Sequence, residues 1–175
     1  VSVLTAGNYD VDKTHSNVSF KVKHLMLSSV KGTFDEFTGN YEYDEKSGVL
    51  KSLSGSIETN SINTNLADRD KHLKADDMLD TKKFPNILFK LTKAKEDVVY
   101  GDITIKGITK NIKLHFDNNG HLKDPWGNYR SAFELTGKIN RKDFGLTYNK
   151  VLESGGLIVG DIVKLSIEVE GIKTK

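Results

Sequence analysis

The sequence predicts an all-β, single-domain protein with one helical insertion. A chain of 175 residues has the size of one domain, and no linker, repeat or change of composition divides residues 1–175. From residue 9 onward, apolar residues mostly alternate with polar ones, which is the period of a strand with one solvent-exposed face. Turn signals separate these runs, namely DEKSG at 44–48, NNG at 118–120 and DPWGN at 124–128.

The strand candidates number about eight, a count typical of a sandwich or a barrel. SNVSFKVKH at 16–24 places Val18, Phe20 and Val22 on one side and polar residues on the other, and DIVKLSIEVEG at 161–171 alternates most regularly. Closing the sheet into a barrel would hide the apolar face and remove the edges, leaving an interior that is filled by side chains or holds one ligand. The other candidate strands are 30–44, 49–59, 86–92, 97–106, 110–117 and 129–139.

One stretch, RDKHLKADDMLDTKKF at 69–84, predicts a helix that begins near Leu66 and covers about 66–80. On such a helix Leu66 and Leu73 share a face with Arg69 and Asp70. We expect this face to lie against the barrel opening, with the leucines on an apolar rim. Two interpretations of the charges stay open, a structural ion pair and a contact with the polar end of a ligand.

Composition and motifs argue against several functions. Lys+Arg 26 against Asp+Glu 24 gives a net charge of +2, too balanced to indicate a nucleic-acid partner. There is no cysteine and no nucleophile elbow, so we expect no nucleophilic catalysis. The histidines show no metal-ligand pairing, and we expect no metal or other cofactor. They are His15, His24, His72, His115 and His121.

We expect a cytoplasmic location, because no signal-peptide pattern and no apolar run of about 18 residues is present. An exported form after processing stays open. The segment DVDKTHS at 10–16 gathers Asp12, His15 and Ser16 before a strand. Turn formation explains these residues, and a polar site at one mouth of a barrel is the alternative.

Five motifs, taken in order, resemble the YceI-like family, and the resemblance runs from about Tyr9 to Gly171. They are YDVDKTHSNVSFKVKH, GTFDEFTG, RDKHLKADDMLD followed by FPNILF, GDITIKGITKNIKL, and INRKDFGL. The resemblance implies an extended eight-stranded antiparallel lipocalin-like barrel, with the helix near its opening and an apolar tunnel. It also implies non-catalytic binding of a long-chain amphiphilic lipid, most simply a polyisoprenoid.

The family patterns fall on particular residues of this chain. D-x-x-H-S falls on Asp12, His15 and Ser16; R-D-x-H-L falls on Arg69, Asp70, His72 and Leu73; and R-x-D-F-G falls on Arg141, Asp143, Phe144 and Gly145. The sequence departs from the family at Met78 and Leu79, where paired aromatics are frequent. We expect the head group of the lipid to contact Asp12, His15, Ser16, Arg69, Asp70 and His72.

The tail pocket is expected to be lined by the inward-facing residues of the strands. They are Val18, Phe20, Val22, Phe34, Ile57, Ile87, Phe89, Leu91, Ile103, Ile112, Leu114, Phe116, Phe133, Val163, Leu165 and Ile167. For each aromatic among them, a purely structural place in the core is the alternative. An enzyme acting on a lipid head group, with His15 or His72 as acid or base and Arg69 as anion holder, is the competing function. Transient membrane contact and a homodimer stay open.

Overall fold

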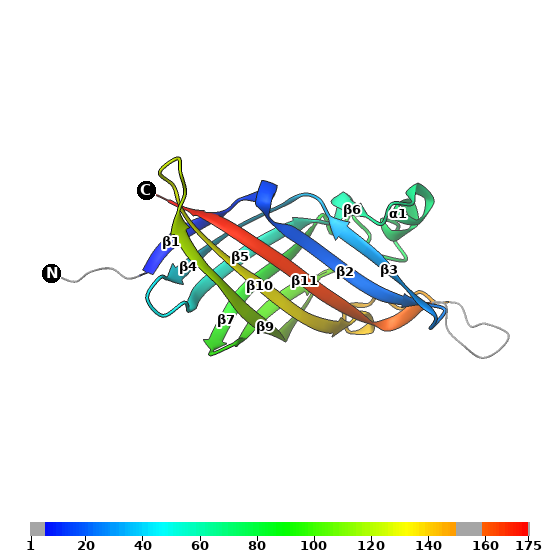
Figure 1. The fold of residues 1–175 in the computed structure, drawn as a ribbon. Coiled ribbons are helices and arrows are strands. Elements are labelled where there is room, and N and C mark those ends of the chain that lie inside the picture. The colour runs from blue at the N-terminus through cyan, green and yellow to red at the C-terminus, as the bar shows by residue number, and fades with distance from the viewer. Residues whose placement is uncertain (1–5, 150–158, 175) are drawn as a thin grey trace.

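The computed structural model describes residues 6–149 and 159–174, which form one elongated antiparallel barrel with a short helix near one end (Figure 1). Its strands are β1 (Ala6–Val11), β2 (Asn17–His24), β3 (Ser28–Phe34), β4 (Phe37–Asp44), β5 (Leu50–Glu58), β6 (Ile62–Asn63), β7 (Asn86–Lys95), β8 (Val98–Ile105), β9 (Ile108–Lys123), β10 (Tyr129–Asn140) and β11 (Val159–Lys173). Its helices are α1 (Ala67–Leu73) and the 3₁₀ turns η1 (Lys13–His15), η2 (Thr59–Ser61) and η3 (Arg141–Phe144).

Strand pairing closes the barrel. Hydrogen-bonded neighbours follow the order β1-β4-β5-β7-β8-β9-β10-β11, and β11 pairs again with β1. Beyond η1 the wall continues, because β2 pairs with β11, β3 with β2, and β6 with β3. The expected eight-stranded antiparallel barrel is therefore confirmed, and the sandwich alternative is wrong.

Two details of the strands differ from the sequence prediction. The expected run 30–44 is divided at Asp35 and Glu36 into β3 and β4. The expected turn NNG lies inside β9, where the register shifts between Ala132 and Phe133 of the partner strand. Gly120, with φ 98°, accommodates this bulge, so the chain reverses only at DPWGN.

The helix is shorter than expected, because α1 ends at Leu73 and not near residue 80. After Leu73 the backbone forms short turns, with the N–H of Ala75 donating to the carbonyl of His72 and that of Met78 to Ala75. Asp80 has a left-handed backbone with φ 50°, which a helix does not accept. Among the described residues no helix has the length and apolar character needed to span a membrane.

The core divides along the barrel into two hydrophobic clusters. The first is rich in aromatic rings and consists of Tyr9, Tyr41, Tyr43, Leu50, Leu53, Val99, Leu114, Phe116, Phe133, Leu135 and Val169. The second, on the side of α1, is mostly aliphatic and consists of Ile62, Leu79, Ile87, Ile103, Ile105, Ile139 and Phe144. Stacked rings fill the first part of the bore, since Tyr9 stacks on Tyr41 at 5.2 Å and Tyr41 meets Phe133 edge-on at 5.0 Å.

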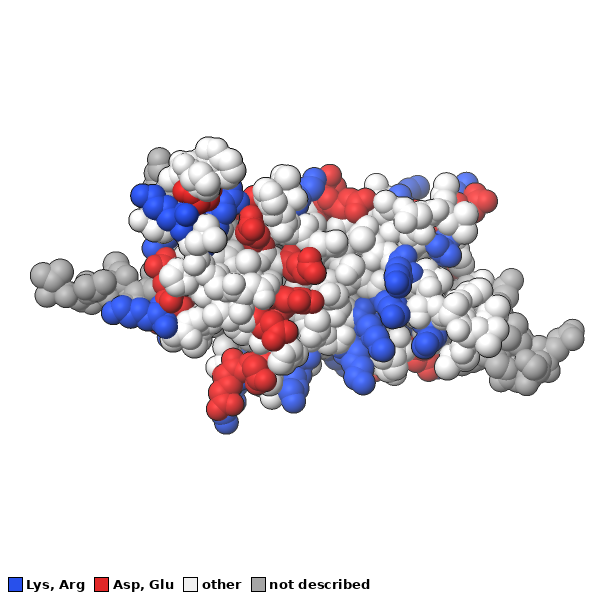
Figure 2. Space-filling model, in the orientation of Figure 1, with Lys and Arg blue, Asp and Glu red and all other residues white. Residues whose placement is uncertain are grey.

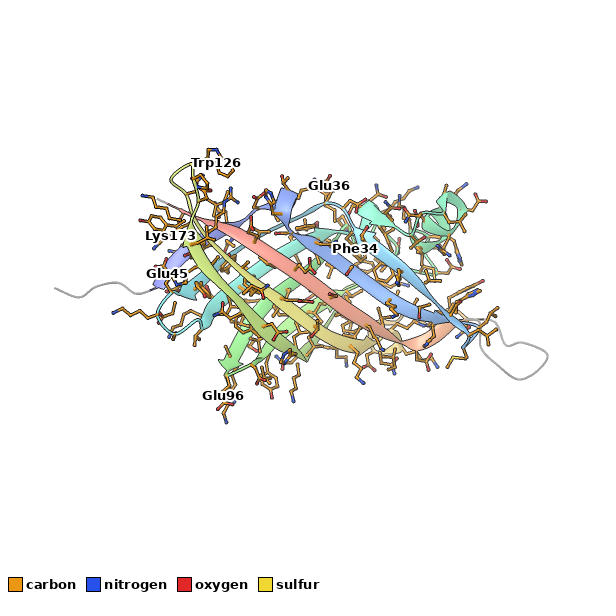
Figure 3. All side chains as sticks on the ribbon, in the orientation of Figure 1. Phe34, Glu36, Glu45, Glu96, Trp126 and Lys173 are labelled. Carbon is orange, nitrogen blue, oxygen red and sulfur yellow. The ribbon has the colours of Figure 1, made fainter. Side chains whose placement is uncertain are left out.

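The outer surface carries groups of like charges. On the face shown in Figure 2, a band of acidic side chains crosses the half of the barrel away from α1, and a group of basic side chains crosses the half that carries β3. Basic side chains also lie at the β9–β10 end, and acidic ones lie near α1. Trp126 projects from the tip of the β9–β10 hairpin, at the end opposite α1 (Figure 3).

Candidate functional site: an apolar cavity in the barrel

A cavity of about 160 Å³ lies inside the half of the barrel that holds the aliphatic cluster. Apolar side chains of the strands and of the α1 region form nearly all of its wall. The lining residues are Val18, Ser19, Phe20, Val22, Phe34, Ile57, Ile62, Leu73, Met78, Leu79, Ile87, Ile103, Ile105, Ile139, Arg141, Leu146, Val159, Val163, Leu165 and Ile167.

A second cavity of about 70 Å³ continues along the bore toward the aromatic cluster. Val18, Ile57 and Ile167 line both cavities, so these three side chains stand where one meets the other. Phe89 and Leu114 line the smaller cavity. Together the cavities describe an elongated apolar space that ends against the stacked rings of Tyr41 and its neighbours.

The structure places most of the expected tail-pocket residues at these cavities. Val18, Phe20, Val22, Phe34, Ile57, Ile87, Ile103, Val163, Leu165 and Ile167 line the larger one. Several of them are half-buried, because Phe20, Phe34, Ile57, Val163 and Leu165 pack against the aliphatic cluster and also border the open space.

Four expected pocket residues lie elsewhere, and the prediction is corrected for them. Phe116 and Phe133 are buried members of the aromatic cluster, with ring centroids 5.5 Å apart, and Leu91 and Ile112 pack against that cluster. All four point inward as their alternation predicts. The bore is filled at their level, because large rings meet there across its width.

Residues near strand ends, in loops and in α1 also form part of the cavity wall, although the sequence pattern does not predict them. Ile62, Leu73, Leu146 and Val159 lie near or beyond strand ends, where alternation gives no signal. Met78 is half-buried at the wall, in the position where the sequence departs from the family pattern. A flexible thioether side chain adapts to irregular space, which suits a cavity wall.

Arg141, the first residue of η3, is a charged side chain in this apolar wall and is only 4% exposed. Its Nε donates to the carbonyl of Gly160 at 2.9 Å. Its Nη1 donates to the carbonyl of Leu146 and, at 2.8 Å, to the carbonyl of Tyr148. Burial lowers the pKa of its guanidinium, and Asp161, 3.7 Å away, acts in the opposite direction. Arg141 therefore uses its donors to join β10, the 146–149 segment and the start of β11.

The charged side chains Arg69 and Asp70 of α1 form hydrogen bonds with Thr64, in the segment just before the helix. Asp70 Oδ1 accepts hydrogen bonds from the backbone N–H of Thr64, at 2.9 Å, and from its hydroxyl. Arg69 donates from Nε to the same hydroxyl and from Nη2 to the Thr64 carbonyl, both at 2.7 Å. Thr64, which is 4% exposed, thus anchors the helix, in place of the direct Arg69–Asp70 ion pair that the sequence suggested.

The apolar face of α1 meets the cavity with only one of its two leucines. Leu73 lines the larger cavity, whereas Leu66 is 51% exposed, so the expected apolar rim is wrong for Leu66. His72, next to Leu73, bonds through Nε2 to Asp77 at 3.2 Å and lies edge-on to the ring of Tyr148 at 4.7 Å. His72 and Tyr148 therefore stand side by side at the α1 end of the cavity.

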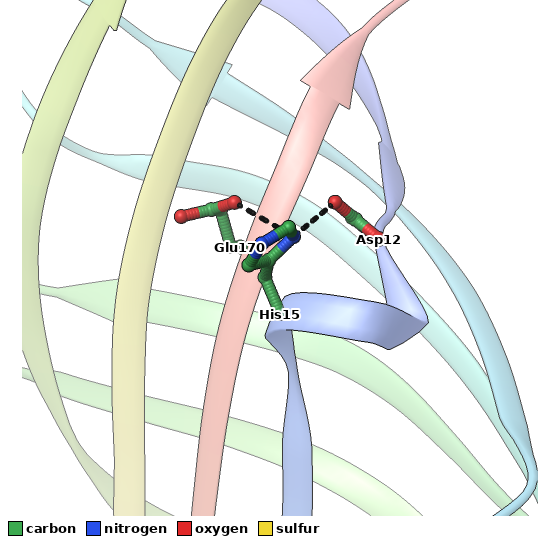
Figure 4. A group of neighbouring side chains, drawn as sticks. All are labelled: Asp12, His15 and Glu170. Carbon is green, nitrogen blue, oxygen red and sulfur yellow. Dashed lines mark hydrogen bonds and ion pairs between the residues drawn. The ribbon is translucent and has the colours of Figure 1, made fainter.

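Asp12, His15 and Ser16 lie on the outer wall, at the break between β1 and β2. His15 Nδ1 is 2.8 Å from Asp12 Oδ2 and 3.6 Å from Glu170 Oε2 (Figure 4). Ser16 accepts a hydrogen bond from the backbone N–H of Glu170 at 3.0 Å and donates to its carbonyl. Ser16 thereby replaces a strand partner where η1 interrupts the sheet.

Arg130 completes this outer cluster. Its Nη1 is 3.0 Å from both Asp12 Oδ2 and Glu170 Oε2, and its Nε is 2.7 Å from Asp124 Oδ2. The hydrogen bond with His15 and the one from Arg130 lower the pKa of Asp12 against the opposing effect of burial. Asp12, His15 and Glu170 place potential metal ligands within 4.8 Å of one another, but Arg130 already occupies the same carboxylate oxygens.

The two groups of expected head-group residues do not meet. No hydrogen bond or ion pair among the described residues links Asp12, His15 or Ser16 to Arg69, Asp70 or His72, and η1 and α1 are separated along the barrel (Figure 1). The charges of α1 therefore do not lie near His15, as a single head-group site made of all six residues would require. Both groups stabilise a junction in the wall, one between β1, β2 and β11 and the other before α1.

An antiparallel eight-stranded barrel that encloses an apolar cavity beside a short helix defines the lipocalin-like class. The family model of the YceI-like domain matches residues 9–171, and this chain belongs to that family. A UPF0312 protein of Yersinia enterocolitica is 37% identical over 176 residues, covering 97% of this chain and 88% of that protein.

Solved structures share the fold. A YceI protein of Campylobacter jejuni is 34% identical, covers 94% of this chain and 96% of that one, and has a TM-score of 0.76. A Saccharophagus degradans domain described as polyisoprenoid-binding covers 95% and 98%, with a TM-score of 0.70. At 14% identity the second likeness shows the fold alone.

Proposed function

We propose that this protein binds a long-chain amphiphilic lipid, most simply a polyisoprenoid, and releases it chemically unchanged. The observation that carries the proposal is the apolar cavity of about 160 Å³ and its continuation of about 70 Å³. Burying a chain in such a space contributes about 0.8 kcal/mol per CH₂. A few prenyl units then offset the several kcal/mol lost on immobilising the ligand.

We place the tail between Val18, Ile57 and Ile167 and the polar end near α1. Leu73 and Met78 border the cavity there, and His72 with Tyr148 supplies polar atoms beside them. The polyisoprenoid-binding description of the Saccharophagus degradans domain supports the ligand class by analogy of fold.

The competing enzyme has less support. It would use His15 or His72 with Arg69, yet His15 belongs to the outer cluster and Arg69 is engaged by Thr64. His72 does have a carboxylate partner in Asp77, which is the arrangement of a general base. Incubating the loaded protein and analysing the ligand separates the two functions, since a carrier returns it unchanged.

Filling the cavity tests the proposal. Ile57 is half-buried where the two cavities meet, so Ile57→Phe should occupy the bore and remove long-chain lipid from the purified protein. Ile108→Phe makes the same change at a side chain that is 36% exposed on the outer surface and should leave the lipid in place. Native mass spectrometry of protein purified from its host measures both. A folded Ile57→Phe variant with wild-type lipid occupancy would contradict the proposal.

A further inference from the structure

Four lysines form a continuous row across the outer wall of the barrel. The strand register sets Lys138 opposite Lys164, Lys164 opposite Lys21, and Lys21 opposite Lys31, on β10, β11, β2 and β3. All four side chains are exposed, and no ion pair joins any of them to an acidic residue in the part of the chain that the structure describes. We call these four residues the lysine row; Figure 2 shows basic side chains gathered on this half of the face.

The lysine row is unfavourable for folding by itself. Like charges directly opposite each other on neighbouring strands destabilise a sheet, whereas alternating signs stabilise it. Four residues further along β10 and β11, Glu134 and Glu168 also lie opposite each other, and Glu134 lies opposite Asp117 of β9. Setting like charges opposite each other in both rows therefore costs stability, which points to an external partner for the lysine row.

The β2–β3 hairpin beside the lysine row ends in three large apolar residues, Leu25, Met26 and Leu27. Leu25 and Met26 both have left-handed backbones, with φ 53° and 57°, and the N–H of Leu27 donates to the His24 carbonyl at 3.0 Å. Such a turn strongly favours Asn and Gly. Burial does not compensate here, because Met26 is 63% and Leu27 85% exposed. The tip is thus strained and apolar together, a combination that stability does not explain.

We propose that the β2–β3 tip and the lysine row form a docking surface for an anionic lipid bilayer. The tip would enter the boundary between head groups and acyl chains, while the ammonium groups lie against the phosphates. A broad row of flexible lysines on a sheet suits a field of charges, whereas one bound phosphate is more often held by a bidentate Arg. The exposed apolar side chains of the tip favour a bilayer over an acidic protein as the partner. An acidic protein would need only the lysine charges for binding.

The docking surface adjoins the cavity through the barrel wall. Val22 and Val163 are paired across β2 and β11 and line the cavity on the inner side of the wall. Their sequence neighbours Lys21 and Lys164 belong to the lysine row on the outer side. His24, at the base of the tip, pairs with Val159, which also lines the cavity. Docking therefore sets this end of the cavity against the bilayer. The inference goes beyond the proposed function and does not rest on it, since vesicle binding is measured without any ligand in the cavity.

Sedimentation with vesicles tests the inference. Wild-type protein should bind vesicles of phosphatidylcholine with about 30% phosphatidylglycerol and lose binding at about 1 M salt, where the Debye length is about 3 Å. Replacing Lys21, Lys31 and Lys164 together by Gln should weaken the partition coefficient at least about tenfold, since one lysine near an anionic surface contributes about fivefold. The control variant replaces Lys51, Lys90 and Lys95 by Gln, on β5 and β7, and has the same net charge as the first variant. It should change binding less than about twofold.

The tip has its own variant and its own control. Met26→Gly with Leu27→Ser should weaken vesicle binding and raise the melting temperature, because Gly relieves the left-handed backbone. Trp126→Ser removes a side chain that is 80% exposed at the opposite end of the barrel (Figure 3) and should leave binding unchanged. The inference is overturned if wild-type protein fails to bind, which would favour an acidic protein partner. It is also overturned by equal losses in the two lysine variants, or by a loss with Trp126→Ser as large as with the tip variant.

Discussion

At the scale of single residues, the barrel uses arginine to replace missing backbone partners. Arg141 is buried, and its donors satisfy carbonyl groups of Gly160, Leu146 and Tyr148 outside the regular ladder. A buried charge is costly unless it is paired and hydrogen-bonded, and here backbone dipoles provide most of that compensation. Arg69, only half-buried, performs a smaller version of the same task at Thr64.

This difference predicts unequal effects of the same substitution. Arg141→Met should lower the free energy of unfolding by about 3 kcal/mol or more, because several buried carbonyls lose their donor. Arg69→Met should cost about 1 kcal/mol, since solvent replaces part of its contact with Thr64. Urea denaturation measures both, and equal losses would show that Arg141 is no more structural than Arg69.

The outer cluster predicts a dependence of stability on acid. Burial raises the pKa of Asp124, but hydrogen bonds from Arg130 and from the backbone N–H groups of Asn128 and Trp126 outweigh it and lower the pKa to about 2. A pKa lowered on folding adds stability that is complete above the unfolded value of 3.8 and is lost as pH falls toward 2. Thermal melting between about pH 5 and pH 2 should show this loss. In Asp124→Asn the slope over that range should be smaller; an unchanged slope would assign the loss to other carboxylates.

At the scale of elements, closure of the barrel depends on close contact between β11 and the ring of Tyr41. Gly171 of β11 lies opposite Val11 of β1, in the strand pair that closes the barrel. It is so close to Tyr41 that a Cβ added at Gly171 would be 2.3 Å from the Tyr41 hydroxyl oxygen. That hydroxyl is fixed by Ser131 Oγ at 2.7 Å, and burial raises the Tyr41 pKa to about 12. The ring cannot move aside without breaking this buried hydrogen bond.

Gly171→Ala should therefore destabilise the fold by about 1–3 kcal/mol, the usual cost of overpacking. Gly55→Ala is the matched control on β5, where the nearest contact of an added Cβ is the Thr38 carbonyl oxygen at 3.6 Å. Chemical denaturation of the two variants measures the difference. A stable Gly171→Ala protein would mean that β1 and β11 separate without affecting the rest of the barrel.

At the scale of the whole molecule, the two halves of the bore differ in how fully side chains fill them. The aromatic half is filled by rings of Tyr9, Tyr41 and Phe133, whereas the aliphatic half leaves open volume beside α1. An empty apolar space gives up dispersion contacts that a ligand can restore. Under the proposed function, the unloaded protein is therefore less stable than the loaded one.

Loading should raise the melting temperature by about 5–10 °C when the free lipid concentration is near 100 times its Kd. At that concentration, binding stabilises the folded state by about 2.7 kcal/mol, which corresponds to this shift in a protein of this size. Calorimetry of delipidated and reloaded protein measures the shift. The Ile57→Phe variant should show no shift, because its bore is occupied. Identical melting of loaded and unloaded wild-type protein would contradict binding within the barrel.

The sequence by itself determined the all-β class, the approximate number of strands and which side chains face inward, because a period of two is a local property of each strand. Val163 and Phe133 both follow that period, but only the tertiary structure decided that Val163 lines a cavity and Phe133 fills the core. Asp12 and Arg130, 118 residues apart, meet only when β10 and β11 lie beside β1. The lysine row likewise depends on the register between β10, β11, β2 and β3, a relation between distant segments that alternation within one strand does not encode.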